Sequence, residues 1–134
     1  MINVYLCYNG NCEEAMRFYD KAFGTQHTIC GRYKDAPPCD GTQITKEMDN
    51  YIMHGGIKLG ENQELYFCDV PNGVPFNESI NVSLAFETAD KAKEVFAALS
   101  EGGKITEPIG EVFWSECYGS LVDKFGVNWM ITVL

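Results

Sequence analysis

Residues 2–9 alternate between apolar and polar side chains, and a similar alternation returns at residues 80–87. The apolar-face positions are Ile2, Val4, Leu6 and Tyr8 in the first segment, and Ile80, Val82, Leu84 and Phe86 in the second. A period of two residues is typical of a β-strand with one apolar face. Each segment is therefore predicted to be a strand whose other residues, among them Tyr5, Cys7 and Ser83, lie on the opposite face.

An amphipathic helix is predicted after each of these strands. Apolar residues recur at helical spacing at Ala15, Phe18, Tyr19, Ala22 and Phe23, and again at Ala92, Val95, Phe96 and Leu99. Asn11 and Glu14 form a capping-box pattern at the start of the first helix, and Thr88 or Asp90 is predicted to cap the second. Gly24 and residues 102–103 mark the two helix ends, because glycine readily adopts the left-handed conformation found there.

Three further strand-like stretches follow each helix. They span about 26–33, 51–59 and 63–70 in the first half, and about 104–109, 112–122 and 126–133 in the second. Residues 60–62 and 123–126 are typical of hairpin turns, with Asp123 accepting backbone hydrogen bonds and Gly126 permitting a positive φ. Each half therefore has the predicted order β-α-β-β-β.

The two halves also repeat in sequence. A shift of 78 residues aligns identical residues at six positions of the segment 2–24, among them Phe18 with Phe96 and Gly24 with Gly102. This favours an α+β fold in which two βαβββ modules form a curved eight-stranded mixed sheet. We expect a single domain over residues 1–134, with module one at 1–70, a linker at 71–79 and module two at 80–134. The polar faces of the two sheets would then line a cup, which is the natural binding site.

The amino-acid composition and net charge of the chain exclude some classes of binding partner. The net charge of −9 and the sequence pI of about 4.6 disfavour nucleic acid and anionic membranes, which attract basic patches. No apolar run is long enough to span a bilayer and no secretory signal is visible, so we expect a cytoplasmic protein. The six cysteines form no C-x-x-C pair and are interpreted as free thiols packed as small hydrophobic side chains.

Several segments together resemble the PhnB-like branch of the vicinal-oxygen-chelate (glyoxalase/bleomycin-resistance/dioxygenase) superfamily. They are residues 5–15, 18–19, 23–24, 52–54, 65–69, 113–114, 118–119, 123–127 and 129–131. The resemblance implies the fold of that superfamily, a homodimer and a cytoplasmic location. PhnB-like proteins are sometimes labelled ubiquinone methyltransferases, but we reject that activity here because the chain has no glycine-rich strand-to-helix turn for a nucleotide cofactor.

Metal-dependent members of the superfamily hold a divalent ion with His, Glu or Gln side chains from the first and last strands of each module. The matching positions here carry Asn3 or Tyr5, Asn81 or Ser83, and Asn128, Met130 and Thr132. None of these is a histidine or a carboxylate, so no conventional metal site and no firm cofactor is predicted. One reading places a displaced divalent metal or an acid–base cluster at His54 and Glu111, with Cys68 as a third candidate member. The alternative is a histidine hydrogen-bonded on the sheet and a solvated loop glutamate.

Aromatic residues complete the candidate pocket. Trp114, Tyr118 and Tyr5 could line the cup, although Trp114 could equally pack in the core, where we place Trp129. The candidate ligand pocket comprises Tyr5, Cys7, His54, Cys68, Ser83, Trp114 and Tyr118. We expect a protein that binds a small organic molecule, cationic or neutral because the chain is acidic, without the usual metal site. The alternative is a metal-dependent lyase, isomerase or dioxygenase acting on a vicinal-oxygen substrate, so whether the protein is an enzyme is left open.

Overall fold

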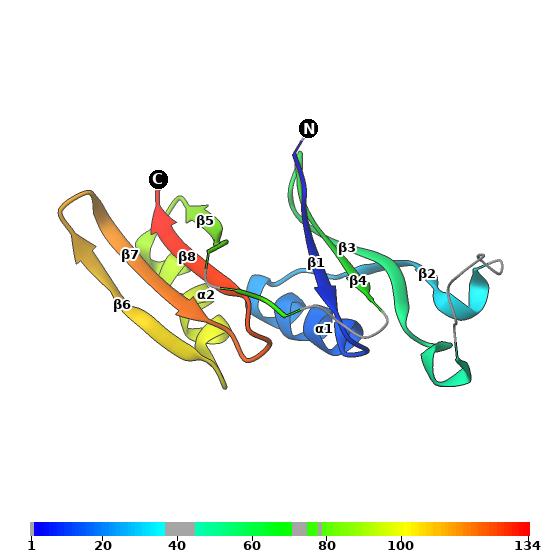
Figure 1. Cartoon of the computed structure of the whole chain (residues 1–134). Helices are drawn as coiled ribbons and strands as arrows, with labels where there is room; N and C mark the ends of the chain where they lie inside the picture. The colour runs from blue at the N-terminus through cyan, green and yellow to red at the C-terminus, as the bar shows by residue number, and fades with distance from the viewer. Residues whose placement is uncertain (1, 37–44, 71–74, 78) are drawn as a thin grey trace. The chain divides into compact units, whose positions relative to one another are not determined.

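The computed structural model describes residues 2–36, 45–70, 75–77 and 79–134. The chain divides into two compact units, Met1–Pro75 and Phe76–Leu134. Each unit has the predicted order of one strand, one helix and three strands, as Figure 1 shows.

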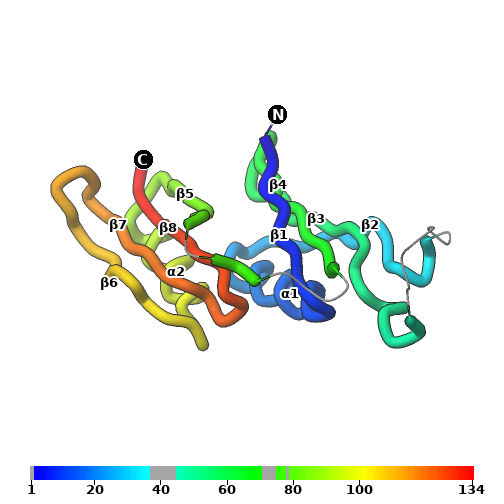
Figure 2. Tube along the Cα trace, in the orientation of Figure 1, coloured from blue at the N-terminus to red at the C-terminus, as the bar shows by residue number. Residues whose placement is uncertain are grey.

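The first unit contains one four-stranded sheet and one helix. Its elements are β1 (Val4–Tyr8), α1 (Cys12–Phe23), β2 (Thr28–Arg32), β3 (Ile52–Gly60) and β4 (Gln63–Asp69), with short 3₁₀ turns at Tyr33–Asp35 and Lys46–Met48. The strand order is β1-β4-β3-β2. The β1 and β4 strands pair in parallel, side by side in Figure 2, and the other neighbours pair antiparallel.

The second unit repeats this plan. Its elements are β5 (Val82–Phe86), α2 (Ala89–Ser100), β6 (Lys104–Val112), β7 (Ser115–Val122) and β8 (Asn128–Val133). The strand order is β5-β8-β7-β6, again with one parallel pair, β5 with β8. The prediction of an α+β fold from two βαβββ modules is confirmed. The hydrogen bonds of the described strands make two four-stranded sheets, whereas we had expected one eight-stranded sheet.

Each sheet buries one face against its helix. In the first unit, α1 packs on β3 and β4 and covers Leu6, Tyr8, Ile57, Leu65 and Phe67 together with its own Met16 and Tyr19. In the second unit, α2 packs mainly on β7 and β8, where Trp129, Leu121 and Ile131 are buried. The predicted core position of Trp129 is confirmed, because its side chain is 0% exposed. The alternate positions of the central strands are left on the opposite, open face of each sheet.

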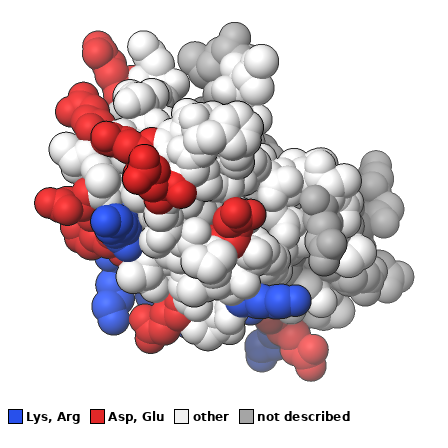
Figure 3. All heavy atoms as spheres, turned by 90° about the vertical axis from the view of Figure 1, so that its left-hand side faces the viewer, with Lys and Arg blue, Asp and Glu red and all other residues white. Residues whose placement is uncertain are grey.

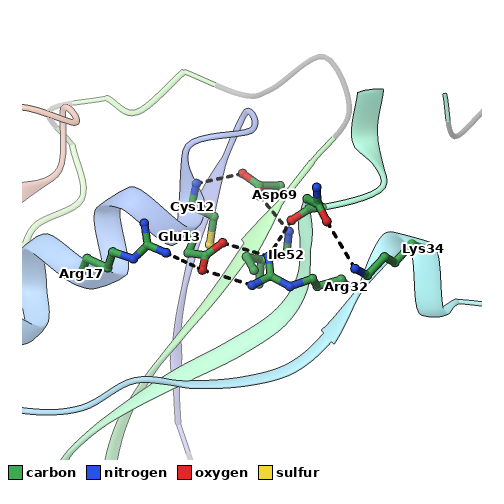
Figure 4. Close-up of polar contacts among 8 residues, drawn as sticks. Cys12, Glu13, Arg17, Arg32, Lys34, Ile52 and Asp69 are labelled. Atoms are coloured by element: carbon green, nitrogen blue, oxygen red, sulfur yellow. Dashed lines mark hydrogen bonds and ion pairs between the residues drawn. The ribbon is translucent and has the colours of Figure 1, made fainter. Parts of the chain in front are cut away.

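The start of α1 is capped from a distant strand and not by the predicted capping box. The Asn11 side chain accepts no capping hydrogen bond. Instead, Oδ1 of Asp69 at the end of β4 accepts from the backbone N–H of Gly10 at 2.7 Å and of Cys12 at 3.1 Å. Oδ2 of the same buried carboxylate accepts from the N–H of Ile52 at 2.9 Å, so Asp69 ties β3 and β4 to the first turn of α1 (Figure 4).

An ion-pair network lies on the outer side of the same helix turn. Both carboxylate oxygens of Glu13 accept from the Arg32 guanidinium, at 2.8 and 3.1 Å, and Oε1 also accepts from Arg17 at 2.9 Å (Figure 4). The hydrogen bond from Arg32 lowers the pKa of Glu13 below its ordinary value. These ion pairs connect α1 to β2.

The predicted turn and cap chemistry of the second unit is confirmed. Asp123 Oδ1 accepts from the backbone N–H groups of Phe125 and Val127, and its Oδ2 accepts from the Trp129 indole at 2.8 Å. Gly126 has a φ of 92°, in the left-handed region. Thr88 caps α2 by accepting from the backbone N–H of Lys91.

Candidate functional site

The open face of the first sheet gathers most of the predicted pocket residues of that unit. Tyr5 of β1 lies opposite Tyr66 of β4, which in turn lies opposite Gly56 of β3. One step along, Cys7 lies opposite Cys68. Because Gly55 pairs with Phe67, continuing the antiparallel register brings His54 beside Cys68. These side chains therefore form two adjacent rows on the face that α1 does not cover.

The centre of this face is a cluster of two tyrosines and one histidine. The Tyr5 hydroxyl is hydrogen-bonded to Nδ1 of His54. The Tyr66 ring lies 5.1 Å from the His54 ring and 5.6 Å from the Tyr5 ring, measured between centroids, and both contacts are tilted. Tyr5 is 47% exposed, so the cluster is open to solvent. We call this cluster of Tyr5, His54 and Tyr66 the aromatic triad.

The Tyr5 hydroxyl can take either hydrogen-bond role in the triad. Partial burial raises the pKa of Tyr5 above its ordinary value, so its hydroxyl is protonated at neutral pH. It donates to Nδ1 of His54 when the imidazole proton is on Nε2, and it accepts from Nδ1 in the other tautomer. The triad thus groups one imidazole ring with two phenol rings, each in contact with the other two.

A hollow of about 150 Å³ adjoins the triad along the same face. It is lined by Asn3, which precedes β1, and by residues of β3, β4 and the hairpin between them, namely Lys58, Gly60, Glu61, Asn62, Gln63, Glu64 and Tyr66. Glu64 lies over Gly56, since a Cβ added there would meet the Glu64 carboxylate oxygen at 2.5 Å. Ligand pockets usually occupy roughly 300–1,000 Å³, so this hollow would hold one group of a ligand and not a whole drug-sized molecule.

The open face of the second sheet carries different side chains at the positions that correspond to those of the first sheet. Ser83 of β5 pairs with Met130 of β8, and Ala85 pairs with Thr132, which lies opposite Tyr118 of β7. Tyr118 therefore takes the place in its sheet that His54 takes in the first. Trp114 lies 5.3 Å from the Tyr118 ring and is 58% exposed. The alternative that Trp114 packs in the core is wrong.

The acid–base and metal candidates are distributed over both units. His54 lies in the first unit, and Glu111 is an exposed residue of β6 in the second. Among the residues that the structure describes, no group of three His, Cys, Asp or Glu side chains is arranged to hold a metal ion. Two predictions depend on how one unit is placed against the other, and both stay predictions. They are the pairing of His54 with Glu111 and the cup shared by the two modules.

The five cysteines that the structure describes are free thiols, as predicted, and Cys39 lies outside the described residues. Cys12 and Cys117 are buried, but Cys30 is exposed, and Cys7 and Cys68 are half-buried on the open face. Tyr66 and Glu64 were not among the residues predicted for the pocket. The alternation of β4 could have identified both residues, because they alternate with the buried Leu65 and Phe67. They therefore share a face with Cys68, which was predicted for the pocket.

The charge distribution agrees with the acidic composition. Figure 3 presents one face of the molecule, on which acidic side chains are more prominent than basic ones. Beside the triad, the hollow carries Glu61 and Glu64 against the single cation Lys58. None of the described helices is both long and apolar enough to cross a membrane.

Comparison with known proteins agrees with the architecture. The family model described as 3-demethylubiquinone-9 3-methyltransferase matches residues 1–132. Protein PA1353 from Pseudomonas aeruginosa is 31% identical, with a TM-score of 0.82 over 99% of this chain and 96% of that one. A putative 3-demethylubiquinone-9 3-methyltransferase, PhnB protein, from Bacillus cereus is 28% identical, with a TM-score of 0.78 over 99% and 98%.

A more distant structure extends the likeness of fold. A glyoxalase/bleomycin resistance protein from Albidiferax ferrireducens T118 has a TM-score of 0.65 at 14% identity, over 100% of this chain and 98% of that one. The chain therefore belongs to the PhnB-like 3-demethylubiquinone-9 3-methyltransferase family and has the α+β fold of the glyoxalase/bleomycin resistance/dioxygenase superfamily.

Proposed function

We propose that this protein binds a small organic molecule, neutral or cationic, on the open face of its first sheet, without the usual metal of the superfamily. The observation that carries the proposal is the aromatic triad of Tyr5, His54 and Tyr66, exposed beside a polar hollow in the same unit. A cluster of tilted aromatic rings on the sheet face opposite α1 offers apolar contact together with polar groups at its edge.

The polarity of the face favours a positive or neutral ligand over an anion. Tyrosine rings attract cations through their electron-rich faces, an interaction of about 0.5–2 kcal/mol depending on desolvation. The hollow adds two carboxylates, Glu61 and Glu64, against one ammonium group, Lys58. A ligand with a cationic group in the hollow and an apolar ring against Tyr5 and Tyr66 fits both features.

The second sheet supports the same proposal from its own open face. Trp114 and Tyr118 make an edge-to-face pair there, and Ser83 supplies a hydroxyl group. In the proposed cup these residues would supply further ligand contacts. The name of the Albidiferax relative refers to bleomycin resistance, and sequestration of a bulky cationic antibiotic is one form that such binding could take.

Methyl transfer is not part of the proposal, although the family description names it. Nucleotide-type cofactors are commonly held at a glycine-rich strand-to-helix turn whose backbone N–H groups are free to contact them. Here the N–H groups of Gly10 and Cys12 are already occupied by the Asp69 carboxylate. The alternative of a metal-dependent lyase, isomerase or dioxygenase would rest on His54 and Glu111, and the metal content of the purified protein tests it.

Three probes that share one ring system test the proposal by isothermal calorimetry. They are a naphthyl compound with a trimethylammonium group, one with a neutral alcohol and one with a carboxylate. We expect the cation to bind best and the carboxylate worst. Tyr66→Ala should weaken binding of the cation by roughly 3–10-fold, since an aromatic contact contributes about 0.5–1.5 kcal/mol.

Met53→Ala is the matched control, because Met53 is an exposed neighbour of His54 on the opposite face of β3. This variant should bind like the wild type. Absence of binding by all three probes, or equal weakening by Met53→Ala, would contradict the proposal. A cytoplasmic homodimer is part of the same proposal, and light scattering of the purified protein tests the homodimer.

A further inference from the structure

The open face of the first sheet also carries a pair of thiols. Cys7 and Cys68 are direct partners across the parallel strands β1 and β4. Their sulfur atoms lie 3.5 Å apart, and both side chains are half-buried. Among the other described cysteines, Cys12 and Cys117 are buried and Cys30 is exposed.

The geometry of this pair is compatible with a disulfide bond. Neighbouring strands lie about 4.7–4.9 Å apart, within the range of roughly 4.4–6.8 Å between Cα atoms that a disulfide spans. The sulfur atoms must approach by about 1.5 Å to reach a bond of about 2.04 Å. Among the described strands of its sheet, β1 is hydrogen-bonded to one neighbour, β4, so it can make part of this movement.

The two thiols have different roles in such a reaction. Burial raises the pKa of Cys68 to about 12, so Cys68 carries its proton at neutral pH. Its S–H donates to the sulfur of Cys7. The thiolate is the nucleophile in thiol–disulfide exchange, and Cys68 holds its proton more tightly than an ordinary thiol. Cys7 is therefore the attacking residue and Cys68 the resolving residue.

We propose that Cys7 and Cys68 form a reversible redox site that reacts with low-molecular-weight disulfides. The Cys7 thiolate attacks one sulfur of the small disulfide, which forms a mixed disulfide and releases one small thiolate. Cys68 then loses its proton to solvent and attacks the sulfur of Cys7, which releases the second small thiolate. Two protein thiols are thereby oxidised to one disulfide, and one small disulfide is reduced to two thiols, with the protons balanced by solvent.

This inference stands apart from ligand binding. It depends on the sulfur geometry of β1 and β4, whereas the proposed ligand site depends on the aromatic triad. The two are linked by position, because His54 follows Cys68 in the same row of the sheet. Oxidation is therefore also expected to change the affinity of the open face for a ligand, but the redox test needs no ligand.

The test uses the reduced full chain equilibrated with mixtures of glutathione and glutathione disulfide. Samples are quenched with acid, alkylated and analysed by intact mass and peptide mapping. We expect an intramolecular disulfide that joins Cys7 to Cys68 and is reversed by excess glutathione. In Cys68→Ser, glutathione should stay bound to Cys7, because the resolving thiol is gone.

Cys30→Ser is the control, since Cys30 is an exposed thiol of the same unit. This variant should form the Cys7–Cys68 disulfide over the same range of glutathione ratios as the wild type. The proposal is overturned if the wild type accumulates glutathione on Cys7 without an internal bond. It is equally overturned if mapping finds a different pair. Both outcomes are read from the wild type, so the test does not depend on the folding of a variant.

Discussion

Replacement of Asp69 by asparagine should destabilise the first unit more than any exposed carboxylate change in the same unit. The Asp69 side chain is 1% exposed and accepts hydrogen bonds from the backbone N–H groups of Gly10, Cys12 and Ile52 at 2.7–3.1 Å. In addition, the Tyr33 hydroxyl donates to the Asp69 carbonyl oxygen at 2.8 Å. One carboxylate therefore holds the start of α1, the start of β3 and the end of β4 together.

The expected magnitude follows from these three hydrogen bonds. An asparagine has the same shape, but it keeps one acceptor oxygen and turns an NH₂ group towards at least one backbone N–H. A hydrogen bond to a charged group contributes about 1.5–3 kcal/mol, and leaving a buried donor without an acceptor costs about 1–3 kcal/mol. We therefore expect Asp69→Asn to lower the free energy of unfolding by about 2–4 kcal/mol, with the upper part of the range if all three bonds weaken.

The assay is urea unfolding followed by far-ultraviolet circular dichroism. Tryptophan fluorescence is a poor probe here, because Trp114 and Trp129 both belong to the second unit. Hydrogen exchange adds a local readout, since the amide protons of Cys12 and Ile52 should exchange faster in the variant. Asp35→Asn, which changes an exposed carboxylate, should stay within about 0.5 kcal/mol of the wild type. An Asp69→Asn protein as stable as Asp35→Asn, with unchanged exchange at both amides, would refute the reasoning.

Three further predictions concern charge, packing and metal content. Glu13→Gln should cost about 0.5–1 kcal/mol at neutral pH, because the hydrogen bond from Arg32 lowers the pKa of Glu13 in the folded protein. The contribution of the Glu13 carboxylate to the free energy of unfolding is present above the pKa of Glu13 in the unfolded chain. It is lost as the pH falls through the lower pKa of Glu13 in the folded protein. Urea unfolding should therefore show the stabilities of the two proteins converging in acid. Gly119→Ala should lower the free energy of unfolding by about 1–3 kcal/mol, since the added Cβ would meet a ring carbon of Phe96 in α2 at 2.7 Å. Gly110→Ala is the control, because an added Cβ there has nothing within 4 Å and should leave the free energy of unfolding nearly unchanged in the same assay. Elemental analysis of the purified protein should find no stoichiometric divalent metal, and a stoichiometric metal that is lost in His54→Ala would contradict this.

The secondary structure was predictable from the sequence because it depends on local patterns. Alternation around Leu6 and Val82 marks one apolar strand face, and the helical stripe through Ala15 and Tyr19 marks the face that α1 buries. The start of α1 was not predictable in this way. Its capping residue, Asp69, lies 57 positions from Cys12, and no local rule connects two residues so distant along the chain.

The sequence predicted which sheet face carries the candidate site, but it did not predict which residues on that face contact one another. Period-two alternation places Tyr5 and Cys7 on the side away from the core, and the same rule applied to β4 would have included Tyr66. The register between strands decides which of these residues meet. It pairs Cys7 with Cys68 and brings Tyr5 to Tyr66, and register is set by tertiary pairing that a single sequence does not reveal.

Binding at the aromatic triad can be observed directly through its histidine. The chain has two histidines, His54 in the triad and His27, whose ring is hydrogen-bonded to Asp20 away from the open face. In a nuclear magnetic resonance titration with the naphthyl trimethylammonium probe, we expect the imidazole signals of His54 to shift saturably while those of His27 stay unchanged. The signals are assigned with a His27→Asn variant. Constant His54 signals at saturating probe, or equal shifts at both histidines, would contradict a ligand site on this face.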